Sequence, residues 1–167
     1  AAIVESPKAG RPLPKTLSVQ DIDLLLAEAR ARVSRAEGKG RFKAERLYCL
    51  LELLAATGLR VSELVGLTVR AVTADDAFLA IKGKGGRERL VPVSDRARGV
   101  LQGYLKTLAA REAAETKWLF PSHGASGCLT RQHFAIELKA LAAACGLDLG
   151  KVSPHVLRHA FASYLLE

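Results

Sequence analysis

The most informative residues of this 167-residue chain are SPHVLRHAFASYLL, at positions 153–166. Ser153 and Pro154 predict the N-cap and the first residue of a helix. His155 then falls in the first helical turn, where unpaired N–H groups and the helix dipole favour an anion. Arg158 follows three residues later on the same face, so the helix start presents a histidine and an arginine together. The opposite face is predicted to be buried and consists of Leu157, Phe161, Tyr164 and Leu165.

Two stretches upstream place single cationic side chains at sharp turns. Arg60 lies in TGLRVSEL, residues 57–64, at the predicted junction of two helices. Lys84 lies in the glycine-rich tip of a predicted hairpin, where glycines leave its ammonium group unobstructed. Each residue also has an ordinary interpretation, as a capping arginine paired with Glu63 and as a solvated turn lysine. A P-loop is excluded because Gly85 follows Lys84 where that motif needs serine or threonine.

The remaining pattern predicts an α+β fold that is mostly α-helical. Ser18 and Asp21 resemble a helix start, and apolar residues recur at helical spacing in segments 22–33, 47–58, 100–108 and 134–145. A polar stretch, residues 34–41, separates the first two helices, and Gly58 ends the second. Short apolar runs at 77–81 and 90–93 predict a hairpin, and a strand near 68–72 would complete a three-stranded antiparallel sheet.

Composition narrows the class of protein. Lys and Arg number 25 and Asp and Glu number 17, so the net charge is +8, and nucleic acid is the commonest partner of so basic a domain. Three cysteines without C-x-x-C spacing argue against a disulfide framework or a structural zinc site, and favour the reducing cytoplasm. No apolar run approaches the roughly 18 residues that span a bilayer, so no membrane association is expected.

Taken together and in order, these motifs resemble the catalytic domain of tyrosine site-specific recombinases, the phage integrase family, and most of all bacterial XerC/XerD recombinases. The matching segments are TGLRVSELVGL (57–67), GKGGRERLVP (83–92), LFPS (119–122), TRQ (130–132) and SPHVLRHAFASYLL (153–166). The resemblance implies an interdomain linker over residues 1–17 and a partial tyrosine recombinase catalytic domain over residues 18–167. The family's C-terminal helices and N-terminal core-binding domain are expected to be absent from this chain.

The resemblance also implies a site and a reaction. Arg60 and Arg158 match the family's arginines that bind the non-bridging oxygens of a phosphodiester. Lys84 matches the general acid, and His155 matches a group that assists the reaction. The family cleaves and rejoins DNA through a phosphotyrosyl intermediate, as in chromosome-dimer resolution during cell division, with no cofactor and no metal. The family's nucleophilic tyrosine has no counterpart among Tyr48, Tyr104 and Tyr164, and the motif that carries the family's second histidine is not found in this sequence. The chain alone is therefore expected to be inactive.

The partners implied are double-stranded DNA, other recombinase protomers in a homo- or hetero-tetramer on DNA, and a DNA translocase of the division site. Further DNA contacts are predicted at Lys82, Arg87, Arg89, Thr130, Arg131 and Gln132. A second basic set is interleaved with glutamates, so a solvated helix face explains it equally well; it comprises Arg30, Arg32, Arg35, Lys39, Arg41, Lys43 and Arg46.

Two other functions remain open for the chain. Because it offers no nucleophile at the family's position, it could be a non-catalytic DNA-binding or regulatory fragment. His155 and His159, four residues apart, could also bind a metal in a hydrolase. Val156 stands where the metallopeptidase motif H-E-x-x-H needs glutamate, which disfavours this interpretation.

Overall fold

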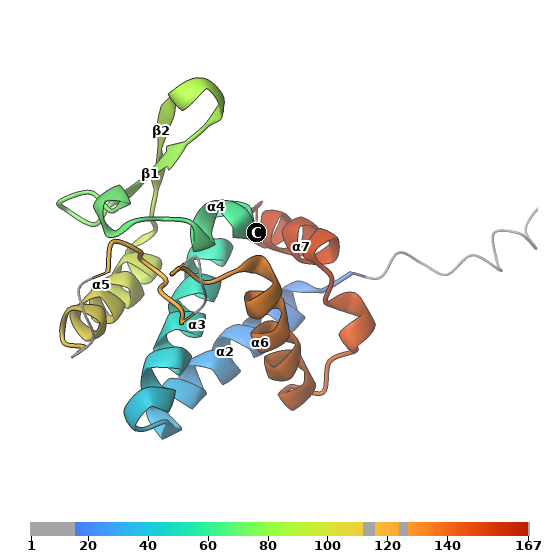
Figure 1. The fold of residues 1–167 in the computed structure, drawn as a ribbon. Coiled ribbons are helices and arrows are strands. Elements are labelled where there is room, and N and C mark those ends of the chain that lie inside the picture. The colour runs from blue at the N-terminus through green and yellow to red at the C-terminus, as the bar shows by residue number, and fades with distance from the viewer. Residues whose placement is uncertain (1–15, 112–115, 124–126, 167) are drawn as a thin grey trace, which may run out of the picture.

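Helix α3 (Gly38–Thr57) runs through the middle of the fold in the computed structural model, which describes residues 16–111, 116–123 and 127–166. It contacts α2 (Val19–Arg35), α5 (Asp95–Ala109), α6 (Arg131–Ala144) and α7 (Pro154–Leu166). Residues 49–55 are all buried, so this part of α3 is enclosed on every side, as expected of a central helix. Figure 1 shows the other helices arranged around it.

The helix boundaries follow local capping chemistry. The Ser18 hydroxyl accepts a bond from the Asp21 N–H, and the Asp21 carboxylate accepts one from the Ser18 N–H, which confirms the predicted start of α2. Gly58 ends α3 with a left-handed φ of 66°. The connection between the first two helices is shorter than the polar stretch predicted over residues 34–41, because α2 continues to Arg35 and α3 begins at Gly38. The other polar residues of this stretch lie in the end turns of the two helices, and only residues 36 and 37 connect them.

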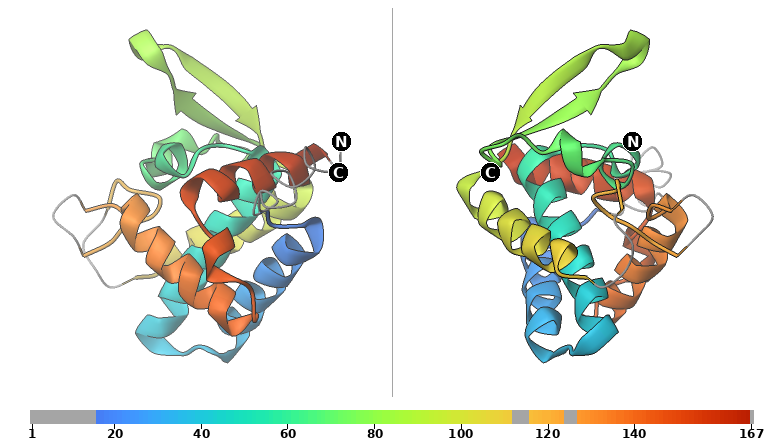
Figure 2. Two further views of the ribbon diagram at one scale, coloured as in Figure 1. Left: turned by 90° about the vertical axis from the view of Figure 1, so that its right-hand side faces the viewer. Right: turned by 60° about the vertical axis from the view of Figure 1, so that its left-hand side comes forward.

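The antiparallel hairpin is confirmed. Strands β1 (Phe78–Lys82) and β2 (Glu88–Pro92) pair with Leu79 opposite Val91 and Ile81 opposite Arg89. The turn η2 (Lys84–Gly86) is possible because Gly85 and Gly86 both adopt positive φ. Figure 2 shows the hairpin extending away from the helical body, at the end where α4 (Val61–Val65) and α7 also lie.

The predicted third strand near residues 68–72 is wrong, and the sheet has two strands among the described residues. This segment instead contains the 3₁₀ turn η1 (Val69–Ala71), in which the Ala71 N–H donates to the Thr68 carbonyl. Single β-bridges remain on either side, Thr68 with Trp118 and Val72 with Leu79. The local turn takes backbone groups that a continuous ladder would need, so pairing stops after one bridge at each end.

The last helix begins as predicted, with the Val156 N–H bonded to the Ser153 hydroxyl at 3.2 Å. Its predicted buried face is correct for Leu157 and Phe161 but not for Leu165, which is 47% exposed. Tyr164 is half-buried, and its hydroxyl donates to Asp23 on α2. The 3₁₀ turn η3 (Leu149–Lys151) leads into this helix.

The predicted linker, residues 1–17, falls almost wholly outside the described residues, as does Glu167 at the end of the chain. Within the described ranges, no helix combines the length and the apolar character that crossing a bilayer requires.

Candidate functional site

Three of the four predicted catalytic residues line one pocket of about 570 Å³. Arg60 comes from the α3–α4 junction, Lys84 from the hairpin tip and Arg158 from α7, so segments far apart in sequence meet here. The pocket has a strongly positive lining, since its charged residues are Arg60, Lys82, Lys84, Arg89 and Arg158 against the single carboxylate of Glu63. This charge favours an anionic ligand.

The backbone at the α3–α4 junction explains why Arg60 and Arg158 line the same pocket. Gly58 turns the chain with positive φ, and Arg60 then takes the extended N-cap position of α4. A Cβ on Gly58 would lie 3.3 Å from Leu165 Cδ2, so glycine also allows α7 to approach closely. The junction therefore aims Arg60 at a pocket that α7 reaches from another side.

Glu63 connects the junction to the hairpin, a role that the sequence reasoning missed. Its Oε1 accepts a bond from the Arg60 N–H at 3.1 Å, and its Oε2 pairs with Arg89 Nη2 at 3.1 Å. The expected pairing of Arg60 with Glu63 thus involves the backbone N–H. Among the described residues, no ion pair engages the side chains of Arg60, Lys84 or Arg158. The available sequence signal was a glutamate three residues after an N-cap, which is the capping-box position.

His155 is not brought into the pocket lining. It is exposed in the first turn of α7, and Arg158 lies about 4.5 Å further along the helix axis at 1.5 Å per residue. The spacing predicted a shared face correctly but could not predict which turn of that face borders the pocket. In the described part of the chain, His155 and His159 belong to no group of three metal-ligating side chains.

The additional DNA contacts predicted from the sequence divide between two places. Lys82 and Arg89 line the pocket, and Arg87 is exposed on the hairpin next to it. The other three residues lie exposed at the start of α6, outside the pocket lining, and are Thr130, Arg131 and Gln132.

The second basic set is not a uniform surface. Arg35 pairs with Glu28 and Arg41 with Glu45, as expected for a solvated face. The Arg35 hydrogen bond holds the pKa of the Glu28 carboxyl below its usual value. Arg46 is only 3% exposed, so it cannot contribute to a basic surface.

All three tyrosine hydroxyls are engaged away from the pocket. Tyr48 donates to Glu52, Tyr104 to the Leu119 carbonyl and Tyr164 to Asp23, at 2.6–2.7 Å. Burial is the main cause that raises the pKa of Tyr48 and Tyr104, and the bond to Asp23 raises the pKa of Tyr164. A raised pKa keeps each hydroxyl protonated and makes it a poorer nucleophile.

Comparison with known proteins gives close relatives along nearly the whole chain. Tyrosine recombinase XerD of Bradyrhizobium diazoefficiens is 53% identical over 175 residues, covering 99% of this chain and 55% of that protein. Tyrosine recombinase XerD of Caulobacter vibrioides is 49% identical over 167 residues, covering 98% of this chain and 52% of that protein. The chain therefore spans about half the length of the curated relatives it matches.

Solved structures agree on the fold. The crystal structure of XerA recombinase aligns with a TM-score of 0.72 and 25% identity, covering 93% of this chain and 52% of that one. XerH site-specific recombinase bound to its difH substrate aligns with a TM-score of 0.71 and 23% identity, covering 92% and 43%. The family model described as the phage integrase family matches residues 15–167. By this match and these relatives, the chain belongs to the phage integrase family, the tyrosine recombinases.

Proposed function

We propose that the chain is the catalytic-domain portion of a Xer-type tyrosine recombinase, which cleaves and rejoins double-stranded DNA through a phosphotyrosyl intermediate. The observation that carries this proposal is the shared pocket of Arg60, Lys84 and Arg158. Three cations on separate segments, without carboxylate partners of their own in the described chain, suit one phosphodiester group. The XerD relatives, which are about 50% identical to this chain, suggest chromosome-dimer resolution in the cytoplasm as the biological role.

The chemistry follows from the charge that develops during cleavage. When a tyrosine hydroxyl attacks phosphorus, it gives up its proton to the surrounding solvent, and negative charge grows on the two non-bridging oxygens. The guanidinium groups of Arg60 and Arg158 bind these oxygens and stabilise that charge more strongly in the transition state than in the ground state. The bond from phosphorus to the 5′ oxygen breaks, and the Lys84 ammonium donates its proton to the departing oxygen. Rejoining reverses both transfers.

His155 has a supporting role in this proposal. It stands one turn before Arg158 and is exposed, so it can meet the DNA backbone beside the phosphate that Arg158 holds. From this place a hydrogen bond to a phosphate oxygen would steady the substrate. The motif, rather than the pocket, supports its assignment.

The nucleophile is proposed to come from a part of the recombinase other than these 167 residues. Each tyrosine here has its hydroxyl bonded elsewhere, and none lines the pocket. The proposed assembly is a tetramer of recombinase protomers on DNA, with a DNA translocase of the division site as a further partner. For the 167 residues alone, the engaged tyrosines favour a second function, DNA binding without cleavage.

A nicked suicide substrate, which traps the covalent intermediate, tests both functions. We expect a full-length recombinase containing this sequence to form a tyrosine-linked adduct, visible by denaturing electrophoresis, and Arg158→Ala to abolish it. The 167-residue chain should bind the same DNA and form no adduct. An adduct on Tyr48, Tyr104 or Tyr164 of the chain, or none with the full-length protein, would contradict the proposal.

A further inference from the structure

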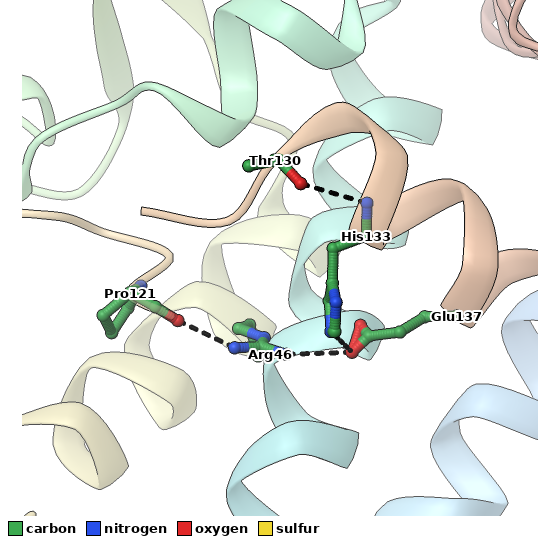
Figure 3. Close-up of polar contacts among 5 residues, drawn as sticks. All are labelled: Arg46, Pro121, Thr130, His133 and Glu137. Atoms are coloured by element: carbon green, nitrogen blue, oxygen red, sulfur yellow. Dashed lines mark hydrogen bonds and ion pairs between the residues drawn. The ribbon is translucent and has the colours of Figure 1, made fainter. Parts of the chain in front are cut away.

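A buried arginine joins three segments on the side of α3 that faces α6. Arg46 Nη1 donates to the Pro121 carbonyl at 2.7 Å, and Arg46 Nη2 donates to Glu137 Oε1 at 2.8 Å. Figure 3 shows the guanidinium between the loop and α6, with both bonds drawn. We call Arg46, Pro121 and Glu137 the Arg46 cluster. It ties α3, the 119–122 loop and α6 to one another.

Stability alone does not account for the Arg46 cluster. Arg46 Nε and Glu137 Oε2 are both buried without a hydrogen-bond partner among the described residues. A buried ion pair with unmet hydrogen bonds costs desolvation energy, and an apolar pair of similar volume often stabilises a fold as well or better. The charged pair instead fixes geometry, because a guanidinium bound to two acceptors holds both of them in defined positions.

The fixed direction extends to the exposed start of α6. His133 Nε2 lies 3.7 Å from the same Glu137 oxygen that Arg46 holds, and the His133 N–H donates to the Thr130 hydroxyl that caps the helix. Arg131 and Gln132 lie between these two contacts and are exposed. The loop side is also tied, since the Leu129 N–H donates to the Phe120 carbonyl at 2.8 Å.

We propose that Arg46 and Glu137 are positioning residues that set the N-terminal turn of α6, so that Arg131 and Gln132 meet the DNA backbone. The inference rests on the proposed DNA function. Arg46 itself is too buried to touch a phosphate, so its effect on binding must pass through α6. Sequence spacing alone placed Arg46 in a basic surface and could not predict this role.

The test measures binding of the 167-residue chain to a 30-base-pair duplex by fluorescence anisotropy at low salt. Arg46→Met with Glu137→Leu removes both charges, so the net charge is unchanged. The matched control is Arg96→Met with Glu52→Leu, which removes an ion pair between α5 and α3. Arg131→Ala removes the proposed phosphate contact directly.

We expect Arg46→Met/Glu137→Leu and Arg131→Ala each to weaken binding by about tenfold, the value of one charge-assisted hydrogen bond. Combining all three substitutions should weaken binding no further, because they act on the same contact. The control pair should change affinity by less than twofold. Wild-type affinity in Arg46→Met/Glu137→Leu, or losses that multiply in the combined variant, would overturn the proposal.

Amide hydrogen exchange tests the positioning of α6 independently of DNA binding. If the unmodified chain binds no duplex, the second proposed function, DNA binding without cleavage, fails. The amides of His133 and Phe134 are bonded to Thr130, and faster exchange of these two amides in Arg46→Met/Glu137→Leu than in the control still supports positioning of α6. Unchanged exchange there would refute it. If the double substitution prevents folding, Arg46→Lys replaces it under the same criteria, since an ammonium group cannot form the same fork.

Discussion

Replacing Arg60, Lys84 and Arg158, three of the cations that line the pocket, should reduce the salt dependence of DNA binding by the equivalent of a single phosphate. The substitutions are Arg60→Gln, Lys84→Gln and Arg158→Gln, whose parent residues share one pocket lining. The logarithm of the binding constant falls with the logarithm of salt concentration by about 0.9 for each phosphate neutralised. Three cations on one phosphate therefore predict a slope change of about 0.9, whereas three cations on separate phosphates predict about 2.7.

The two cases are easily separated by experiment. Between roughly 50 and 200 mM salt, a slope change of 0.9 alters relative affinity by about 3.5-fold and one of 2.7 by about 40-fold. Fluorescence anisotropy of a labelled duplex at several salt concentrations measures the slope. Each single substitution should weaken binding while leaving the slope close to that of the unmodified chain, because two cations remain on the phosphate.

Lys106→Gln supplies the matched control, since Lys106 is an exposed cation on α5 outside the pocket lining. Its slope should equal that of the unmodified chain. A change near 2.7 in the triple variant would refute the shared phosphate, and no change would remove these residues from the DNA interface.

Three further predictions concern the fold that supports the site. Tyr104→Phe leaves the buried Leu119 carbonyl without its 2.7 Å bond and should lower the free energy of unfolding by about 1–3 kcal/mol in urea titrations. Burial raises the pKa of the Cys49 thiol, so the folded state retains a proton that the unfolded state releases at high pH. The free energy of unfolding should therefore fall as pH rises above about 8.5, by up to about 1.4 kcal/mol per pH unit. Cys49→Ala should remove this part of the decline. Glu63→Gln weakens the half-exposed ion pair with Arg89 and should lower the free energy of unfolding by no more than about 1 kcal/mol in the same titration. A larger loss would show that Glu63 stabilises the hairpin more than its exposure indicates.

Local chemistry made much of this molecule predictable from its sequence. Gly58 was predicted to end a helix and Lys84 to occupy a hairpin tip, because positive φ and tight turns depend on residues adjacent in the chain. Ser153 was likewise predicted to cap α7. The start of α6 and the hairpin strands follow similar local signals.

The errors lie where long-range contacts override local patterns. The segment near Thr68 reads as a strand, but its single bridge to Trp118 and the following turn are set by tertiary structure. In the sequence, Arg46 looks like one more basic residue of the set that includes Arg41 and Lys43. It is buried because Pro121 and Glu137 approach it in the folded structure. His155 shares a helix face with Arg158, yet the pocket borders only the later turn.

A crystal structure of this chain bound to a DNA duplex tests the shared phosphate site most directly. We expect the guanidinium nitrogens of Arg60 and Arg158 to lie within about 3 Å of oxygens on the same phosphorus, with the Lys84 ammonium beside a bridging oxygen of that group. Arginines that contact different phosphates, or a duplex bound on a surface that leaves this pocket empty, would contradict it.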